Sequence, residues 1–260
     1  MPVTLDLTGK VALITGGSRG IGAATVRLFT QAGASVAFNY QKAKAEADKL
    51  AQECGPDHCS AIQAELSDAS SGKKLVAAAV ERFGQLDCLV VNHGIWPSND
   101  APIDQMTEAQ WRRTMAINLD SVFSLIKHGV AQMKRQPYTD GSRGHIVIIS
   151  STAGQRGEAL HADYAASKGA IISMVKGLST ELAPYGIYVN CVAPGWVATD
   201  MAAPALSDPA IRDRVLKTIP LGRVGKPEEI AAAILFLCTP HAGFITGEIM
   251  NVNGGAVLVG

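Results

Sequence analysis

The chain has 260 residues, of which 47% are hydrophobic and 18% charged, and its 23 Lys and Arg balance 23 Asp and Glu. This length fits one α/β domain, and the charge balance provides no attraction for nucleic acid or for an anionic membrane. The five cysteines are odd in number and form no CxxC pair, and no apolar run reaches the roughly 18 residues of a membrane span; we therefore expect no metal site, reduced thiols and a cytoplasmic protein.

Short apolar runs alternate with stretches of helical periodicity from one end of the chain to the other. The expected strands are Lys10–Thr15, Ser35–Tyr40, Ser60–Ala64, Cys88–Asn92, His145–Ser150, Tyr188–Ala193 and Ile249–Val252. The expected helices are Ile21–Ala32, Ala43–Cys54, Ser70–Phe83, Trp111–Lys134, Asp163–Ala183 and Pro227–Cys238. This order predicts a single α/β domain over residues 1–260, a Rossmann-type doubly wound parallel sheet of about seven strands flanked by helices. The strands are apolar throughout, as strands buried on both faces should be.

Three stretches have little regular pattern, namely Trp96–Pro102, Gln136–Gly144 and Ala202–Gly225. Ligands of open α/β sheets bind beyond the carboxyl ends of the strands, where such loops lie. We therefore expect a substrate loop at about 196–225, with Trp96, His161 and Trp196 among the residues that the pocket could use.

The first expected strand runs directly into a glycine-rich segment, Thr15–Gly22, and a helix follows. Gly16 would allow a tight turn, Gly20 would leave room for a phosphate, and Gly22 would let the helix pack against the strand. Free N–H groups at the start of the helix would then face a pyrophosphate. The spacing is GxxxGxG rather than GxGxxG, so an ordinary glycine-rich turn is the alternative; the position between strand and helix favours a dinucleotide.

The end of the second expected strand carries no carboxylate that could hold a ribose hydroxyl, because the first acid after Tyr40 is Glu46. Arg19 and Lys42 supply two cations instead, which suits a ribose 2′-phosphate. This favours NADP(H) as cofactor, with NAD(H) possible. The alternative is that both cations only face solvent.

Tyr164 follows Ser151 by thirteen residues and precedes Lys168 by four. Positions i and i+4 share one face of a helix, so the lysine charge would lie beside the phenol and lower its pKa. A tyrosine of this kind can give a proton to a carbonyl oxygen or take one from an alcohol, and a serine at a strand end can bind the same oxygen. A YxxxK pair alone could be a surface pair; the serine and the glycine loop argue against that.

With these motifs together, the sequence resembles the short-chain dehydrogenase/reductase family over essentially its whole length. The matching stretches are Thr15–Gly22, Asn92–Gly94, Ala116–Leu119, Ser150–Ser151, Tyr164–Lys168, Pro194–Gly195 with Thr199, and Asn253–Gly255. The resemblance implies that Tyr164 is the general acid/base and that Lys168 lowers its pKa and binds the nicotinamide ribose. It also implies that Ser151 orients the substrate oxygen and that Asn118 holds a water of a proton relay.

The same resemblance implies a cofactor site of Gly16, Ser18, Arg19, Gly20, Ile21, Gly22, Asn39, Tyr40, Lys42, Glu65, Leu66, Asn92, Gly94, Tyr164, Lys168, Pro194, Gly195, Val197 and Thr199. Two positions depart from the family pattern. The usual NNAG reads Val91-Asn92-His93-Gly94, so His93 is expected to alter packing beside the cofactor, a catalytic His93 being the alternative. Glu65 stands where many relatives carry Asp.

The last third of the chain, with Ile219–Glu229 and Gly247–Gly255, resembles 3-oxoacyl-[acyl-carrier-protein] reductases. This resemblance implies an NADPH-dependent homotetramer that acts on a small carbonyl or alcohol, carried on acyl carrier protein or on CoA. Tyr185 stands where such reductases often place Arg, although Arg135 and Arg143 lie nearby in sequence. Sugar, alcohol or hydroxysteroid dehydrogenases, a silent dinucleotide-binding regulator, and a lyase or isomerase on the same scaffold remain alternatives.

Overall fold

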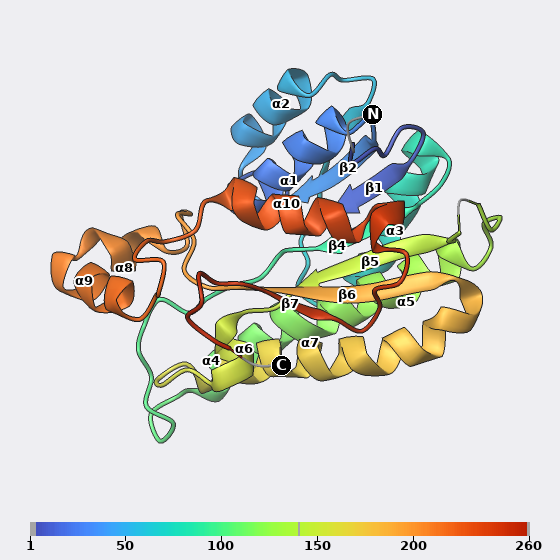
Figure 1. Ribbon diagram of the computed structural model, residues 1–260. Helices are drawn as coiled ribbons and strands as arrows, with labels where there is room; N and C mark the ends of the chain where they lie inside the picture. Colours follow the sequence, from blue (N-terminus) through green and yellow to red (C-terminus); the bar gives the residue numbers. More distant parts are fainter. Residues whose placement is uncertain (1–3, 140, 259–260) are drawn as a thin grey trace.

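In the computed structural model, which describes residues 4–139 and 141–258, seven parallel strands form one sheet in the order β3-β2-β1-β4-β5-β6-β7 (Figure 1). The strands are β1 (Val11–Ile14), β2 (Ser35–Tyr40), β3 (Cys59–Gln63), β4 (Cys88–Val91), β5 (Gly144–Ile149), β6 (Ile187–Pro194) and β7 (Ile249–Val252). The predicted doubly wound sheet is confirmed. The strand order reverses between β1 and β4, and this is the place where open α/β sheets bind ligands.

Helices cover both faces of the sheet, as Figure 1 shows. One face is covered by α1 (Gly20–Gln31), α2 (Lys44–Glu53) and α10 (Pro227–Leu237). The other face is covered by α3 (Ser71–Phe83), α5 (Ser121–Met133) and α7 (Ala162–Leu182). The central strands are buried along their whole length between these two layers, which explains why they are apolar apart from His145 of β5.

The segment predicted as one helix over Trp111–Lys134 is divided in the structure. It begins earlier, as α4 (Glu108–Met115), because the Thr107 side chain caps it by accepting from the Gln110 amide at 3.1 Å. A π-helical turn, η1 (Ala116–Asp120), then separates α4 from α5. Such wide turns are frequent at functional sites.

The stretch Ala202–Gly225, expected to be irregular, contains two short helices, α8 (Ala203–Ser207) and α9 (Pro209–Lys217), which lie apart from the sheet in Figure 1. The Asp208 carboxylate caps α9 by accepting from two amides, and Pro209 opens the helix. The Asp-Pro pair was an available helix-start signal.

The remaining short elements are α6 (Thr152–Arg156) and the 3₁₀ turns η2 (Ala183–Tyr185) and η3 (Pro240–Ala242). All five cysteines are free thiols, as predicted. Within residues 4–139 and 141–258, no helix combines the length and the apolar character that crossing a membrane requires.

Candidate functional site

The glycine loop joins β1 to α1 at the carboxyl edge of the sheet. Gly16 and Gly20 have φ of +63° and +55°, a backbone region that side chains disfavour. A Cβ on Gly22 would lie 2.1 Å from the Gly16 carbonyl oxygen, so only glycine lets the helix approach the loop. No described side chain caps the start of α1, so its first N–H groups are free to meet an anion.

Asn39, near the end of β2, fixes the glycine loop through hydrogen bonds. Its Oδ1 accepts from the Gly16 amide at 2.7 Å, and its Nδ2 donates to the Ala64 carbonyl at 3.0 Å. The Gly17 amide also donates to the Asn39 carbonyl, at 2.9 Å. Asn39 was predicted to bind the cofactor. In the structure it is buried, and its side-chain amide positions the glycine loop.

The two predicted phosphate cations are exposed and lie near the loop. Arg19 is the N-cap of α1, and its Nη1 lies 3.4 Å from Oδ2 of Asp200. Lys42 is exposed just beyond β2, next to buried Tyr40. Sequence reasoning missed Asp200, which now competes with any phosphate for Arg19.

The two residues predicted to lie near the adenine follow β3. Glu65 is exposed and its Oε1 accepts from the Gln41 side chain at 3.0 Å. Leu66 is buried beside it. Ser18 and Ile21 lie half-buried in the loop and the first turn of α1.

Ser151, Tyr164 and Lys168 come together at the carboxyl end of β5. Ser151 follows β5 and caps α6 by accepting from the Ala153 amide at 3.1 Å. Tyr164 and Lys168 lie on one face of α7, and the Lys168 Nζ is 5.8 Å from the centroid of the Tyr164 ring. The Lys168 ammonium donates to the Ile149 carbonyl at 2.8 Å, which anchors α7 to β5.

The electrostatics of this trio differ from the prediction. Burial raises the pKa of Tyr164 to about 12; a hydrogen bond with Ser151 lowers it, and the charge of Glu158 raises it further. Burial also lowers the pKa of Lys168 to about 8. The predicted lowering of the Tyr164 pKa is thus wrong for the protein alone, because burial has the largest influence and raises the pKa.

Asn118 lies in the π-helical turn and is fully buried. Its Oδ1 accepts from the Ile95 amide at 2.8 Å, and its Nδ2 donates to the Ile95 carbonyl at 3.0 Å and to Ser167 Oγ at 3.2 Å. A Cβ placed on Gly94 would lie 3.3 Å from Asn118 Oδ1 and 3.4 Å from Lys168 Nζ. Gly94 therefore marks the point where β4, η1 and α7 bring these groups together.

Asn92 and His93 connect β4 with the glycine loop. The Asn92 Nδ2 donates to the carbonyls of Thr15 and Gly16, at 3.0 and 3.3 Å. His93 Nδ1 lies 2.8 Å from Thr15 Oγ1, and its Nε2 lies 2.6 Å from Ser121 Oγ. The His93 ring thus connects the glycine loop to the start of α5, and this contact is the change of packing at that position.

The end of β6 and the loop after it close the other side. Pro194 is the last residue of β6, and Gly195 packs against Asn253, whose Cβ would lie 3.0 Å from a Cβ at that glycine. Val197 is buried and pairs with Gly225 in an isolated bridge, so the two ends of the predicted substrate loop meet. Thr199 lies against Gly20, with its Cγ2 3.2 Å from where a Cβ would stand.

An aromatic wall covers Tyr164. The Trp96 ring lies 4.7 Å from the Tyr164 ring in an edge-on arrangement and 4.0 Å from the His161 ring. His161 Nε2 lies 3.3 Å from Oδ1 of Asp100, and the Ala101 amide donates to the Leu160 carbonyl at 3.0 Å. Trp96 and His161 were named as pocket residues, but their contact with each other could not be derived from spacing.

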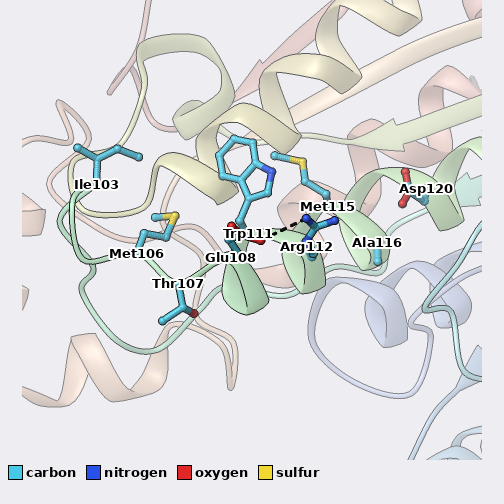
Figure 2. A pocket seen from close by; sticks show the side chains of 9 residues that line it. All are labelled: Ile103, Met106, Thr107, Glu108, Trp111, Arg112, Met115, Ala116 and Asp120. Carbon is cyan, nitrogen blue, oxygen red and sulfur yellow. Dashed lines mark hydrogen bonds and ion pairs between the residues drawn. The ribbon is translucent and has the colours of Figure 1, made fainter.

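Figure 2 shows a hollow on α4 into which Met106, Trp111 and Met115 project, with the Glu108–Arg112 ion pair on its border. Arg143 precedes β5 and donates to the Tyr185 carbonyl at 2.8 Å, at the edge of the sheet opposite to Tyr164. Arg143 and Tyr185 of the same chain therefore do not lie at the opening of the site.

Comparison with known proteins identifies a family and close relatives. The family described as "Enoyl-(Acyl carrier protein) reductase" matches residues 16–257. A 3-oxoacyl-[acyl-carrier-protein] reductase of Synechocystis sp. is 37% identical over 255 residues, which cover 97% of this chain and 98% of the relative.

Two solved structures from Brucella melitensis have closely similar folds. A short-chain dehydrogenase/reductase of the glucose/ribitol dehydrogenase type has a TM-score of 0.89 and 38% identity, covering 99% of this chain and all of that one. A 3-ketoacyl-(acyl-carrier-protein) reductase complexed with NADH has a TM-score of 0.87 and 31% identity, covering 98% and 100%.

Proposed function

The chain belongs to the short-chain dehydrogenase/reductase family, whose members are oxidoreductases that bind a nicotinamide dinucleotide, and from this premise we propose that it reduces a 3-oxoacyl thioester with NADPH. The observation that carries the proposal is the open position at Gly94, where Asn118 Oδ1 and Lys168 Nζ both lie within 3.4 Å of the place that a Cβ would occupy, together with the Ser151–Tyr164 hydrogen bond. An acyl group held on acyl carrier protein or on CoA is the proposed substrate.

The residues present fit a dinucleotide. The uncapped start of α1 offers N–H groups to a pyrophosphate, and Gly20 and Gly94 keep the adjacent space free of side chains. Lys168 would bind the nicotinamide ribose, and Pro194, Val197 and Thr199 would border the nicotinamide. The bound cofactor supplies the hydride, and the protein supplies placement and electrostatics.

The proton chemistry belongs to this chain's own residues. Ser151 would hydrogen-bond the substrate oxygen and orient it toward the Tyr164 hydroxyl. Tyr164 is protonated at neutral pH because burial raises its pKa, so it can donate a proton to the oxygen as negative charge develops there. The Lys168 ammonium would stabilise the resulting phenolate, and Asn118 would hold a water that returns the proton from solvent.

The preference for NADPH follows from the charges around the adenosine end. Arg19 and Lys42 are exposed cations near the glycine loop, and the end of β2 offers the phenol of Tyr40 rather than a carboxylate. A 2′-phosphate would replace Asp200 as the partner of Arg19. The related Brucella reductase is complexed with NADH. Binding of both cofactors to this chain therefore has to be measured to test its preference for NADPH.

We further propose that the protein is a cytoplasmic homotetramer. Trp111 on α4 and Phe123 on α5 are 40% and 50% exposed, and the hollow of Figure 2 adds more apolar surface on the same helix. Phe244 and Leu258, near the chain end, are also exposed. Apolar surface of this kind suits symmetric contacts between copies, and free thiols suit a reducing compartment.

The test is a cofactor titration followed by turnover. Binding of NADPH and NADH is measured by fluorescence, and cofactor oxidation is then followed with acetoacetyl-CoA, an acetoacetyl carrier protein, and a panel of sugars and simple ketones. Turnover of the thioesters with NADPH, well above that with NADH, is the expected result. Turnover of a sugar or polyol instead would assign the protein to the dehydrogenase alternative that the glucose/ribitol-type neighbour represents.

A further inference from the structure

His93 joins the glycine loop to the catalytic helices through side chains alone. Its Nδ1 lies 2.8 Å from Thr15 Oγ1, at the end of β1, and its Nε2 lies 2.6 Å from Ser121 Oγ, the first residue of α5. The Ser121 hydroxyl in turn lies 2.7 Å from the Ile117 carbonyl, inside the π-helical turn. The chain of contacts thus runs from β1 to the turn that carries Asn118.

The hydrogen bonds around Thr15 and Ser121 determine which nitrogen of His93 carries the proton. Thr15 Oγ1 accepts from the amides of Asn92 and His93, at 3.0 and 3.2 Å, so its own proton points to His93 Nδ1. The Val90 carbonyl is the other group that could accept the Thr15 hydroxyl proton, but it lies farther away, at 3.4 Å. Ser121 donates to the Ile117 carbonyl, so its oxygen accepts from Nε2–H of the imidazole. His93 is therefore the neutral Nε2–H tautomer, and burial together with the charge of Lys168 lowers its pKa to about 3.

A π-helical turn has one residue more than an α-helical turn, so its position depends on contacts made by its side chains. Here the turn must hold Asn118 against Ile95 and Ser167 while α4 and α5 continue on either side. The hydroxyl of Ser121 reaches back four residues to the turn, and such back-bonding often bends a helix. His93 holds that hydroxyl from the other side.

We propose that His93 is a positioning residue which, through Ser121, fixes the π-helical turn so that Asn118 stays in its place beside Lys168. The proposal rests on the role given to Asn118 in the proposed function. It explains why an imidazole can replace the small residue of the NNAG pattern without loss of the site: the ring fills the space between β4 and α5 and satisfies both of its nitrogens.

Two conservative variants separate the two ends of the bridge. In His93→Gln, the amide nitrogen stands about where Nε2 does, so it can still donate to Ser121. In His93→Asn, the shorter side chain reproduces only the acceptor for Thr15. Ser121→Ala removes the link from the other side, and thermal unfolding of each variant shows that it is folded.

The first readout does not need activity. Hydrogen exchange of the amides of residues 117–121 should become about tenfold faster in His93→Asn and Ser121→Ala and stay near wild type in His93→Gln. A ¹⁵N spectrum of the wild type should show a protonated Nε2 and a bare Nδ1. Unchanged exchange in His93→Asn, or equal changes in His93→Asn and His93→Gln, would overturn the proposal.

The second readout is kinetic. In His93→Asn and Ser121→Ala, kcat should fall about tenfold or more with little change in KM or in NADPH affinity, because proton return is misaligned while binding is intact. Faster exchange without a fall in kcat would refute the positioning role. If the wild type reduces no carbonyl compound, the proposed function fails, and the exchange experiment still decides whether His93 fixes the turn.

Discussion

The ammonium nitrogen of Lys168 lies 5.8 Å from the centre of the Tyr164 ring and donates to the Ile149 carbonyl at 2.8 Å. This pair therefore combines a cation fixed to the sheet with a phenol that is held neutral by burial. The arrangement favours proton donation by Tyr164, since the proton is present at neutral pH and the product phenolate meets a positive charge.

Replacement of Tyr164 by phenylalanine should lower kcat about 10²- to 10⁴-fold, because the proton donor is lost while the ring remains against Trp96. The dissociation constant for NADPH, measured by fluorescence, should change little. Tyr185→Phe is the matched control, since Tyr185 is exposed at the opposite edge of the sheet and should leave kcat unaltered. An active Tyr164→Phe enzyme would require another proton donor.

The pH dependence of carbonyl reduction should be set by Lys168. Burial lowers its pKa to about 8, so the ammonium is present below that pH and is lost above it. We expect kcat/KM for reduction to fall as pH rises through about 8, and to stay high at neutral pH where Tyr164 keeps its proton. Lys168→Arg keeps the charge and should move the fall to higher pH. A fall at the same pH in that variant would assign it to another group.

Much of this site was predictable because short-range rules determine it. Strands buried on both faces are mostly apolar, and Tyr164 and Lys168 share a helix face because they are four residues apart. The rest depends on contacts distant in sequence. The turn at Ala116–Asp120 has no pattern different from that of an α-helix, and the Trp96 wall requires two loops to meet. The pKa of Tyr164 follows from its burial, which spacing does not reveal.

His145 should make the fold sensitive to acid. It is buried at the start of β5, its ring stacks on Tyr188 at 5.1 Å, and burial lowers its pKa from 6.5 to about 4. A lowered folded-state pKa means that stability is complete above about 6.5 and is lost as pH falls from there toward 4, by up to about 3 kcal/mol. Urea unfolding between pH 7 and 4 measures this loss.

A variant at His145 separates that loss from other acid effects. His145→Gln cannot gain a charge, so the free energy of unfolding should fall less between pH 6.5 and 4 than in the wild type. His58→Gln, at an exposed position, is the control and should follow the wild-type curve. Parallel curves for His145→Gln and the wild type would show that carboxylates alone account for the acid loss.

Selectivity between the two cofactors should depend on Arg19 and its neighbour Asp200. A guanidinium that binds a phosphate forms charge-assisted hydrogen bonds, so Arg19→Ala should raise the dissociation constant for NADPH about tenfold or more and leave that for NADH nearly unchanged. Asp200→Asn frees Arg19 from a partner 3.4 Å away. Because both side chains are exposed, that gain for NADPH should be at most about fivefold. If Asp200→Asn instead weakens NADPH binding, then the carboxylate orients Arg19 toward the phosphate rather than competing with it, and equal losses for both cofactors in Arg19→Ala would place the guanidinium at the pyrophosphate.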